Sequence, residues 1–451
     1  MVKRKDLHRY SFALFLFVAI VFVLAACGAG GEDPGITTLI YAQLSEDGVD
    51  RSWLSKFNLA HKGEVQIEVR NYSQFSEGGK QGIDLLMTEI AAGKGPDIIE
   101  LGTSGETSQL SYRQLAEKGY LEDLWPYIEN DPDLGKDRVM EAPLKAAEIN
   151  GGLYVAFDSF QLHTLVGAKA IVGDRTGWTV EELLEAFAAM PEGSVILDNF
   201  YDYSMKSHLL SSFLYGFSDL FIDWETGQCS FDGKEFCSFL ELASCMPDEY
   251  AWKRSCTTKM ELHDAYYKRM LDGLVLLNDS GFGRLYHMQE FDFLFGGVSC
   301  IGYPVGDGST GSYIQPLGIK LAMSSTCPEK ETAWQYIRKT FLPRQEKESH
   351  LFEGIPINGT SYKRERAECL SLKHGFFWDG EVISFDEPMT LEACQQIEAL
   401  YNTPRSSISI DKEILDIVTE VAGAYFAGDK SLDETVQLIQ NRVTLYVNEQ
   451  K

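Results

Sequence analysis

The spacing of apolar residues changes between two periods along the first third of the chain. Residues 36–44 and 65–72 have the β-branched content and the alternation of strands, and 98–101 is a short apolar run. Between them, 49–60 and 83–92 carry apolar side chains three and four positions apart, which predicts amphipathic helices. Strand, helix, strand, helix and strand in this order predict a parallel sheet that helices cover. We therefore expect an α/β fold.

Polar residues mark the starts of further helices. Ser111 precedes Gln114 by three positions, and Thr179 precedes Glu182 by the same interval. Such pairs are typical of capping boxes, in which two side chains bond the backbone at a helix N-terminus. The second pair predicts a helix that ends near Met190.

The N-terminus carries the pattern of a secretory signal. Cationic residues between positions 3 and 9 precede the apolar run 12–24, and small residues follow it. A run of about 13 residues is short for a bilayer span, which needs about 20. The sequence Leu-Ala-Ala-Cys that ends at Cys27 resembles the bacterial lipobox.

The lipobox resemblance implies a signal peptide at 1–26, cleavage before Cys27, and lipid on the thiol and the amine of that cysteine. It thereby implies a lipoprotein on the extracellular face of the cell membrane. Residues 27–35 are rich in glycine and have nothing to bury, so we expect a flexible tether. An ordinary signal peptide followed by an incidental Cys27 is the alternative.

Composition limits the functions that the rest of the chain can have. A hydrophobic content of 44% over 451 residues suffices for two packed lobes. The net charge is −27, and because residues 1–26 carry four cations and one acid, the remainder stands near −30. We therefore expect no nucleic-acid partner, which would require a basic surface.

Eight cysteines follow Cys27, and their spacing gives no metal motif. None forms a Cys-x-x-Cys pair, and none has a histidine at zinc-ligand spacing. Cys237 and Cys245 lie in one predicted helix, about 12 Å apart along its axis, which is too far for a bridge between them. We expect buried thiols, no metal and no cofactor, and disulfides among the other cysteines stay open.

A series of motifs resembles family 1 extracellular solute-binding proteins, the receptor lipoproteins of ABC importers, many of which take up sugars. Residues 92–101, with the sequence Ala-Gly-Lys-Gly-Pro-Asp-Ile-Ile-Glu-Leu, look like the hallmark of that family. The other motifs follow in the family's order, including a hairpin at 221–232 with a helix at 235–243 after it. They lie at 115–124, 150–157, 177–183, 221–243, 301–308, 333–338, 354–358 and 414–449.

The resemblance implies a two-lobed α/β fold of the type II periplasmic-binding-protein kind, with hinge-linked lobes whose mixed sheets are covered by helices. We expect lobe 1 at 36–157 and 304–350, and lobe 2 at 158–303 and 351–451. Closure of two such lobes buries a ligand in the cleft between them. The implied protein is a monomeric, lipid-anchored receptor, not an enzyme, that binds a carbohydrate and delivers it to ABC permease subunits.

Candidate ligand residues follow from where α/β sheets bind ligands, at the carboxyl ends of strands and at the crossings between lobes. Sugars suit polar side chains that bond hydroxyls and aromatic rings that stack on C–H faces. The candidates chosen on this basis are Gln43, Ser45, Glu46, 102–104 with Ser104, Asp158, Gln161 and Tyr303. Trp378 is a further candidate, either as a ring over the cleft or as part of an insert that packs under a loop.

Other functions stay open at this point. A receptor for a non-sugar solute, or one that reports occupancy to a membrane sensor, would have the same sequence features. A lipid-anchored glycoside hydrolase would need a pair of carboxylates, which 67 acidic residues can supply by chance. The chain has no Gly-x-Ser-x-Gly, His-Glu-x-x-His or Walker motif, which favours binding over catalysis.

Overall fold

The computed structural model describes residues 36–75, 80–102, 110–134, 138–198, 204–248, 250, 252–343, 354–402 and 405–450. The predicted signal peptide, the tether, Cys27 and Ser104 lie outside these residues.

The strands are β1 (Thr37–Gln43), β2 (Val65–Asn71), β3 (Ile98–Glu100), β4 (Ser159–Ala168), β5 (Val195–Asp198), β6 (Ile222–Asp223), β7 (Gln228–Cys229), β8 (Val275–Phe282), β9 (Val298–Cys300), β10 (Tyr313–Leu317), β11 (Leu321–Met323), β12 (Ile355–Pro356), β13 (Gly375–Trp378), β14 (Glu381–Ser384) and β15 (Arg405–Ser406). The helices are α2 (Arg51–Ala60), α3 (Lys80–Ala91), α4 (Tyr112–Glu117), α5 (Trp125–Asn130), α7 (Glu141–Ala146), α8 (Lys169–Val172), α9 (Val180–Ala188), α10 (Met205–Phe217), α11 (Lys234–Ser244), α12 (Lys259–Leu271), α13 (His287–Phe295), α14 (Lys330–Ile337), α15 (Gly359–Ser371), α16 (Leu391–Tyr401), α17 (Lys412–Phe426) and α18 (Leu432–Glu449). Two 3-10 helices matter below, η2 (Ser218–Phe221) and η6 (Ser407–Ser409).

The first sheet confirms the pattern that the sequence predicts for the first third of the chain. Its strand order is β11-β3-β1-β2, and β1 runs parallel to both β2 and β3. Helices α2 and α3 connect these strands. Helix α2 begins after Asp50 because the carboxylate of that residue accepts a hydrogen bond from Trp53 N, at 2.9 Å. Strand β11 comes from much later in the chain and adds antiparallel to β3.

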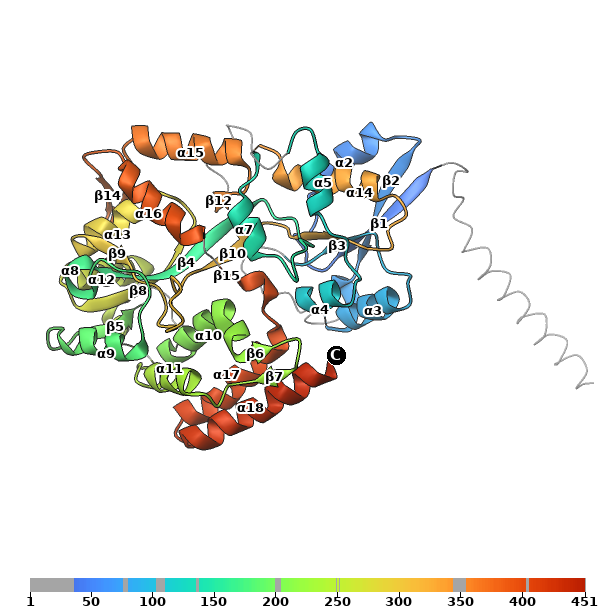
Figure 1. Ribbon diagram of the computed structural model, residues 1–451. Helices are drawn as coiled ribbons and strands as arrows, with labels where there is room; N and C mark the ends of the chain where they lie inside the picture. Colours follow the sequence, from blue (N-terminus) through green and yellow to red (C-terminus); the bar gives the residue numbers. More distant parts are fainter. Residues whose placement is uncertain are drawn as a thin grey trace, which may run out of the picture.

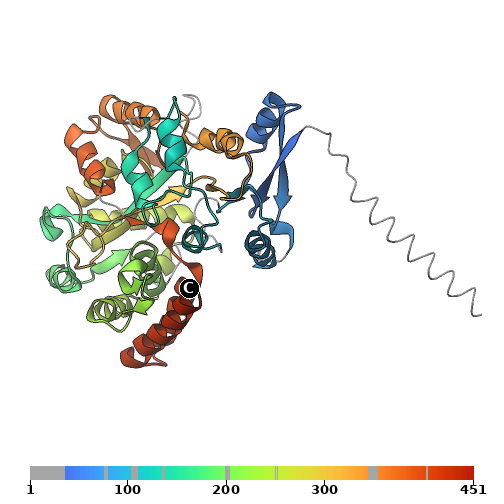
Figure 2. The same cartoon turned by 45° about the vertical axis from the view of Figure 1, so that its right-hand side comes forward.

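The second sheet is larger and mixed. Its order is β15-β10-β4-β8-β5, and β9 and β12 also pair with β4. Strand β4 is antiparallel to β8 and β10, whereas β5 is parallel to β8. The two sheets with their helices are called the first and second lobes below, and Figures 1 and 2 show the blue first sheet on the opposite side of the molecule from the green and yellow helices of the second lobe. The two-lobed α/β fold with mixed sheets is therefore confirmed.

Three segments lie side by side between the sheets, at 156–159, 317–321 and 355–358. Ala156 and Leu321 exchange two backbone hydrogen bonds, of 2.7 and 3.0 Å. The carbonyl of Asp158 accepts from Ile357 N at 2.9 Å. These segments are the connections at which a hinge between the lobes would bend.

The chain returns to the first sheet later than expected. Residues 304–350 were expected in lobe 1, but β10 pairs with β4 of the second sheet, and only β11 reaches the first. The apolar residues after Cys300 form a loop because Gly302 and Gly311 have positive φ, +82° and +60°, and Tyr303 N donates to Gly311 O at 2.7 Å. The other lobe boundaries stay predictions.

Buried side chains form two clusters that do not coincide with the two lobes. One runs through the first lobe and continues over one face of the second sheet, where α12, α13, α15 and α16 cover it. The other fills the opposite face of the second sheet, under α9, α10, α11, α17 and α18. The first lobe therefore shares a continuous core with half of the second.

Several local expectations are met. The hairpin expected at 221–232 is β6 and β7, and the helix after it is α11. Thr179 and Glu182 form a complete capping box at α9. Ser111 accepts a hydrogen bond from Gln114 N, at 3.3 Å, which is half of the expected capping box. The side chain of Gln114 does not complete the box, because its amide donates to Asp411 of the second lobe.

The eight cysteines after Cys27 are all free thiols, and only half of them meet the expectation of burial. Cys300, Cys327, Cys369 and Cys394 are buried, whereas Cys245 is exposed. In the described part of the chain, no helix has the length and apolar character to cross a bilayer, and no cluster of three potential metal ligands occurs.

Candidate functional site

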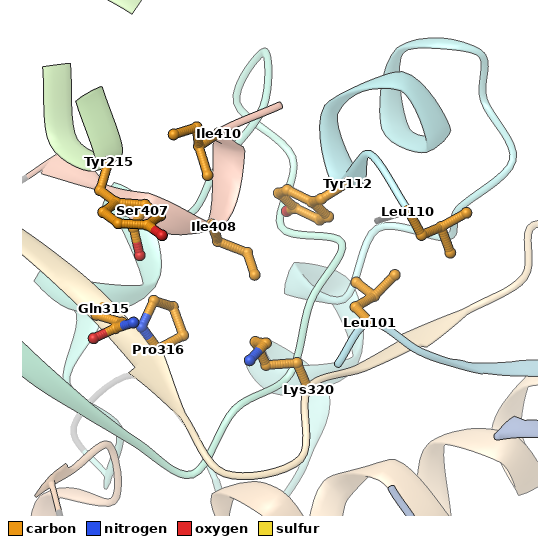
Figure 3. A pocket seen from close by; sticks show the side chains of 10 residues that line it. All are labelled: Leu101, Leu110, Tyr112, Tyr215, Gln315, Pro316, Lys320, Ser407, Ile408 and Ile410. Carbon is orange, nitrogen blue, oxygen red and sulfur yellow. The ribbon is translucent and has the colours of Figure 1, made fainter. Parts of the chain in front are cut away.

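A pocket lies between the two lobes, beside the crossing segments (Figure 3). Its cavity volume is about 30 Å³ in this conformation, and the surrounding space between atoms, part of it open solvent, is about 470 Å³. The side chains around it come from both sheets and from the crossing. They are Leu101, Leu110, Tyr112, Tyr215, Gln315, Pro316, Lys320, Ser407, Ile408 and Ile410.

The first lobe contributes an apolar wall with one aromatic ring. Leu101 follows β3, and its N–H donates to Lys320 O at 2.8 Å, which fixes this strand end against the crossing. Tyr112 opens α4, and its hydroxyl donates to Ala147 O at 2.8 Å and accepts from Tyr154 N at 3.2 Å. Burial raises the pKa of Tyr112. Because its hydroxyl is held by backbone groups, Tyr112 offers the pocket mainly its ring.

The second lobe contributes the more polar wall. Tyr215 comes from α10, Gln315 and Pro316 from β10, and Ser407 from η6 (Figure 3). The side-chain oxygen of Gln315 lies 2.9 Å from Nε2 of His163, on the neighbouring strand β4. This wall therefore combines hydroxyl and amide groups with an aromatic ring, a mixture suited to sugar hydroxyls and C–H faces.

Lys320 lies on the crossing between the lobes and is only 4% exposed. Its backbone bonds Leu101 and Gly102, at the carboxyl end of β3. Burial raises the pKa of nearby Glu100, while hydrogen bonds from Ser45 and Leu44 and the charge of Lys320 lower it in part. Glu100 itself holds the loop after β1, because its Oε2 accepts from Leu44 N at 2.6 Å. A buried cation thus stands at the junction of the two lobes.

The lobes also touch outside the pocket, through the start of α4. Arg113 donates to Asp219 of η2 at 2.7 Å, and its guanidinium lies 4.9 Å from the ring centre of Trp224. The amide nitrogen of Gln114 donates to the Tyr446 hydroxyl at 3.0 Å and to Asp411 at 3.3 Å. The described conformation is therefore one in which the two lobes are in contact across the pocket.

The candidates predicted after β1 hold their own loop. The amide nitrogen of Gln43 donates to Ser45 O at 2.7 Å and to Glu46 O at 3.0 Å, and its oxygen accepts from Arg51 at 3.2 Å. The hydroxyl of Ser45 donates to Glu100. The side chain of Glu46 is exposed. None of the three is among the side chains around the interlobe pocket.

The candidates predicted at the crossings are not among the described side chains that line the pocket. Asp158 accepts from the Ser159 hydroxyl at 2.7 Å, in the first crossing segment. Gln161 donates to Gly281 O at 2.9 Å and pairs in register with Gln315 of the pocket. Tyr303 is buried in the second lobe, where its hydroxyl donates to Asp279 at 2.7 Å. A ligand role for these residues stays a prediction.

Trp378 lies on a hairpin of β13 and β14 that packs on the outside of the second lobe (Figure 1). Phe376 of this hairpin packs against Tyr267 of α12 and Phe293 of α13. Trp378 is not among the pocket side chains. A ligand role for Trp378 stays a prediction.

Sequence reasoning missed most of the pocket. The sequence candidates included Gly102, which is next to Leu101 of the pocket. No pattern in the sequence indicated Tyr112, Tyr215 or the residues of η6. Lys320 had one detectable signal, since it directly precedes the short apolar run that forms β11.

Comparison with known proteins adds to this geometry. No model of a known protein family matches the sequence, and no curated protein sequence matches it. Among solved structures, the sugar-binding protein MalE from Xanthomonas citri is similar over 92% of this chain and 98% of its own, with a TM-score of 0.54 and 15% identity. A family 1 extracellular solute-binding protein from Alicyclobacillus acidocaldarius is similar over 92% of this chain and 99% of its own, with a TM-score of 0.50 and 14% identity.

The chain has the fold of the extracellular solute-binding proteins. Side chains from both lobes line the interlobe pocket, which is where hinged two-lobed folds enclose a ligand. A de novo designed esterase is also similar, with a TM-score of 0.51 and 15% identity over 92% of this chain and 99% of its own. At these identities the solute-binding-protein fold is established, whereas the ligand and the choice between binding and catalysis must be argued from the site.

Proposed function

We propose that the chain is an extracellular receptor of an ABC importer and that it binds a sugar or an oligosaccharide in the interlobe pocket. The observation that carries this proposal is the origin of the pocket side chains. Tyr112 comes from the first lobe and Tyr215 from the second, so a ligand between these rings would hold the lobes together. The similar MalE protein is described as sugar-binding.

The proposal includes no chemical step on this chain. The described pocket side chains provide hydroxyls, an amide and an amine, but no pair of carboxylates for glycoside hydrolysis. His208 and Asp279 do lie 3.0 Å apart, but Asp279 also accepts from the Tyr303 hydroxyl within the second lobe. These groups are not part of the pocket wall.

The proposal includes attachment to the outer face of a cell membrane through lipid on Cys27, and delivery of the sugar to permease subunits. The Cys27→Ala variant should be released into the soluble fraction with unchanged ligand affinity, because the described side chains of the pocket all belong to the two lobes. Fractionation of cells that express either form measures this, and persistence of the variant in the membrane fraction would contradict the anchor.

The test of ligand class is a thermal-shift screen of the fragment that begins at Gly35. The panel holds mono- and oligosaccharides, amino acids, peptides and polyamines. A ligand at about 100 times its Kd adds about 2.7 kcal/mol to the free energy of unfolding, which raises Tm visibly. A shift with sugars alone supports the proposal, and a shift only with another class refutes the carbohydrate assignment. Co-purification with permease subunits distinguishes an importer receptor from a sensor component.

A further inference from the structure

Helices α15 and α16 pack against each other in opposite directions, over one face of the second sheet (Figure 1). The hydroxyl of Tyr401 donates to the hydroxyl of Tyr362 at 2.6 Å. One helical turn along, Arg366 Nε donates to Glu398 Oε1 at 2.7 Å, and the Tyr362 hydroxyl donates to the same oxygen. As the residue number rises along α15, the number of its partner on α16 therefore falls.

This register places two cysteines opposite each other. Cys369 lies three residues after Arg366, which is the next turn on the same face of α15. Cys394 lies four residues before Glu398, which is the matching turn of α16. At this end of the pair, Met389 N donates to Cys369 O at 3.0 Å, so the start of α16 is held against the end of α15. Both cysteines are free thiols, 1% exposed at Cys369 and fully buried at Cys394, and they face each other inside the core.

We propose that Cys369 and Cys394 are a modification site, at which a thiol oxidant outside the cytoplasm forms a disulfide. The bridge would join the last turn of α15 to the first turn of α16 and close the loop that carries the hairpin of β13 and β14. Oxidants of this kind act on exported proteins, whereas cytoplasmic thiols are kept reduced. The extracellular location proposed above supplies this condition, but the inference does not depend on which ligand the pocket binds.

The oxidant is a disulfide of the class that dithiol oxidases carry, and the reaction consists of two thiol–disulfide exchanges. The thiolate of one cysteine attacks a sulfur of the oxidant, forms a mixed disulfide and releases the first oxidant thiolate. The thiolate of the other cysteine then attacks the mixed disulfide and releases the second oxidant thiolate. The chain loses two protons and two electrons, and the oxidant takes up both to become two thiols.

Burial decides when this exchange can occur. It raises the pKa of Cys369 to about 12, with smaller contributions from the charges of Glu365 and of Cys394, and it also raises the pKa of Cys394. Only a thiolate attacks a disulfide, so the folded and reduced pair should react slowly. We therefore expect the bridge to form during folding, before α16 covers α15, and to be protected from reductants once the helices have packed.

Peptide mapping of the full exported chain tests the bridge. The chain is reduced in urea, refolded in a glutathione redox buffer, alkylated in urea and digested with trypsin without reductant. Cleavage after Arg366, Lys373 and Arg405 gives the peptides 367–373 and 374–405, each of which contains one cysteine. The expected result is a species in which these two peptides are linked and which a reductant separates. Alkylation of both Cys369 and Cys394, or a link from either to another cysteine, overturns the inference.

Thermal unfolding of matched variants separates the bridge from packing. The refolded chain should have a Tm about 2–5 °C higher without reductant than with it, because the bridge restricts the unfolded state. Cys369→Ala and Cys394→Ala should each abolish the linked species and this difference in Tm. The control Cys300→Ala removes a buried thiol of β9 in the same lobe and should keep both. An unchanged difference in Cys369→Ala, or its loss in Cys300→Ala, refutes the assignment of the pair.

Discussion

The contact between Arg113 and the second lobe should stabilise the conformation in which the two lobes touch. Arg113 is 12% exposed and Asp219 29% exposed, and their atoms approach to 2.7 Å. A half-buried, charge-assisted pair of this kind contributes about 1–2 kcal/mol. The guanidinium above Trp224 adds about 0.5–1 kcal/mol. Because the pair joins different lobes, it stabilises only the state in which they touch.

The Arg113→Met variant keeps the packing of the stem and removes both interactions. A loss of about 2 kcal/mol shifts the ratio of open to closed molecules about 30-fold towards the open state. Small-angle X-ray scattering should therefore show a larger radius of gyration for the variant without ligand. Ligand affinity, measured by calorimetry, should fall by up to the same factor, since the closed state contributes both walls of the pocket.

The matched control is Arg442→Met, which removes an ion pair of 2.9 Å with Glu420 inside the second lobe. This variant should leave the radius of gyration and the affinity unchanged. If Arg113→Met scatters like the unmodified chain and binds ligand equally well, the contact does not bias the lobes and the reasoning fails.

Three further outcomes follow from contacts within the lobes. Ser431→Ala removes the capping box of α18 and should lower the free energy of unfolding in urea by about 1 kcal/mol. Gly216→Ala would place a methyl group against the ring of Tyr313, and overpacking of this kind should cost about 1–3 kcal/mol in the same assay. Burial would raise the pKa of Asp131, but hydrogen bonds, first from Arg338, outweigh it and hold the pKa below its usual 3.8. The stabilisation by this carboxylate is therefore complete above about pH 4 and is lost as the pH falls through the lowered pKa. In acid unfolding curves, Arg338→Met should make the free energy of unfolding depend less on pH in this range.

Local signals predicted local structure well. The apolar periods gave β1, α2, β2, α3 and β3 to within a few residues, because each element is stabilised along one continuous stretch of sequence. The capping box at Thr179 was predicted for the same reason, since its partner Glu182 is three residues away.

The pocket could not be predicted in this way. Tyr112, Tyr215 and Lys320 belong to three different segments, and only the pairing of distant strands brings them together. Gln43 shows the limit of the rule that ligand residues follow strands. It does lie at the carboxyl end of β1, but its amide is used by the backbone of its own loop. Which polar groups remain for a ligand depends on the hydrogen bonds that the fold itself consumes.

Both sheets include strands from late parts of the chain, so neither sheet can be complete until those parts have been synthesised. Strand β11 covers the edge of β3 and β15 covers the edge of β10, and α17 and α18 close the core on the far face of the second sheet. The first lobe therefore cannot be produced as a continuous fragment without most of the second, and a chain truncated before residue 405 would expose an unpaired strand edge. Contacts between such distant residues form slowly, because long loops must close first. The second cluster of buried side chains should therefore form only after α17 and α18 have been made.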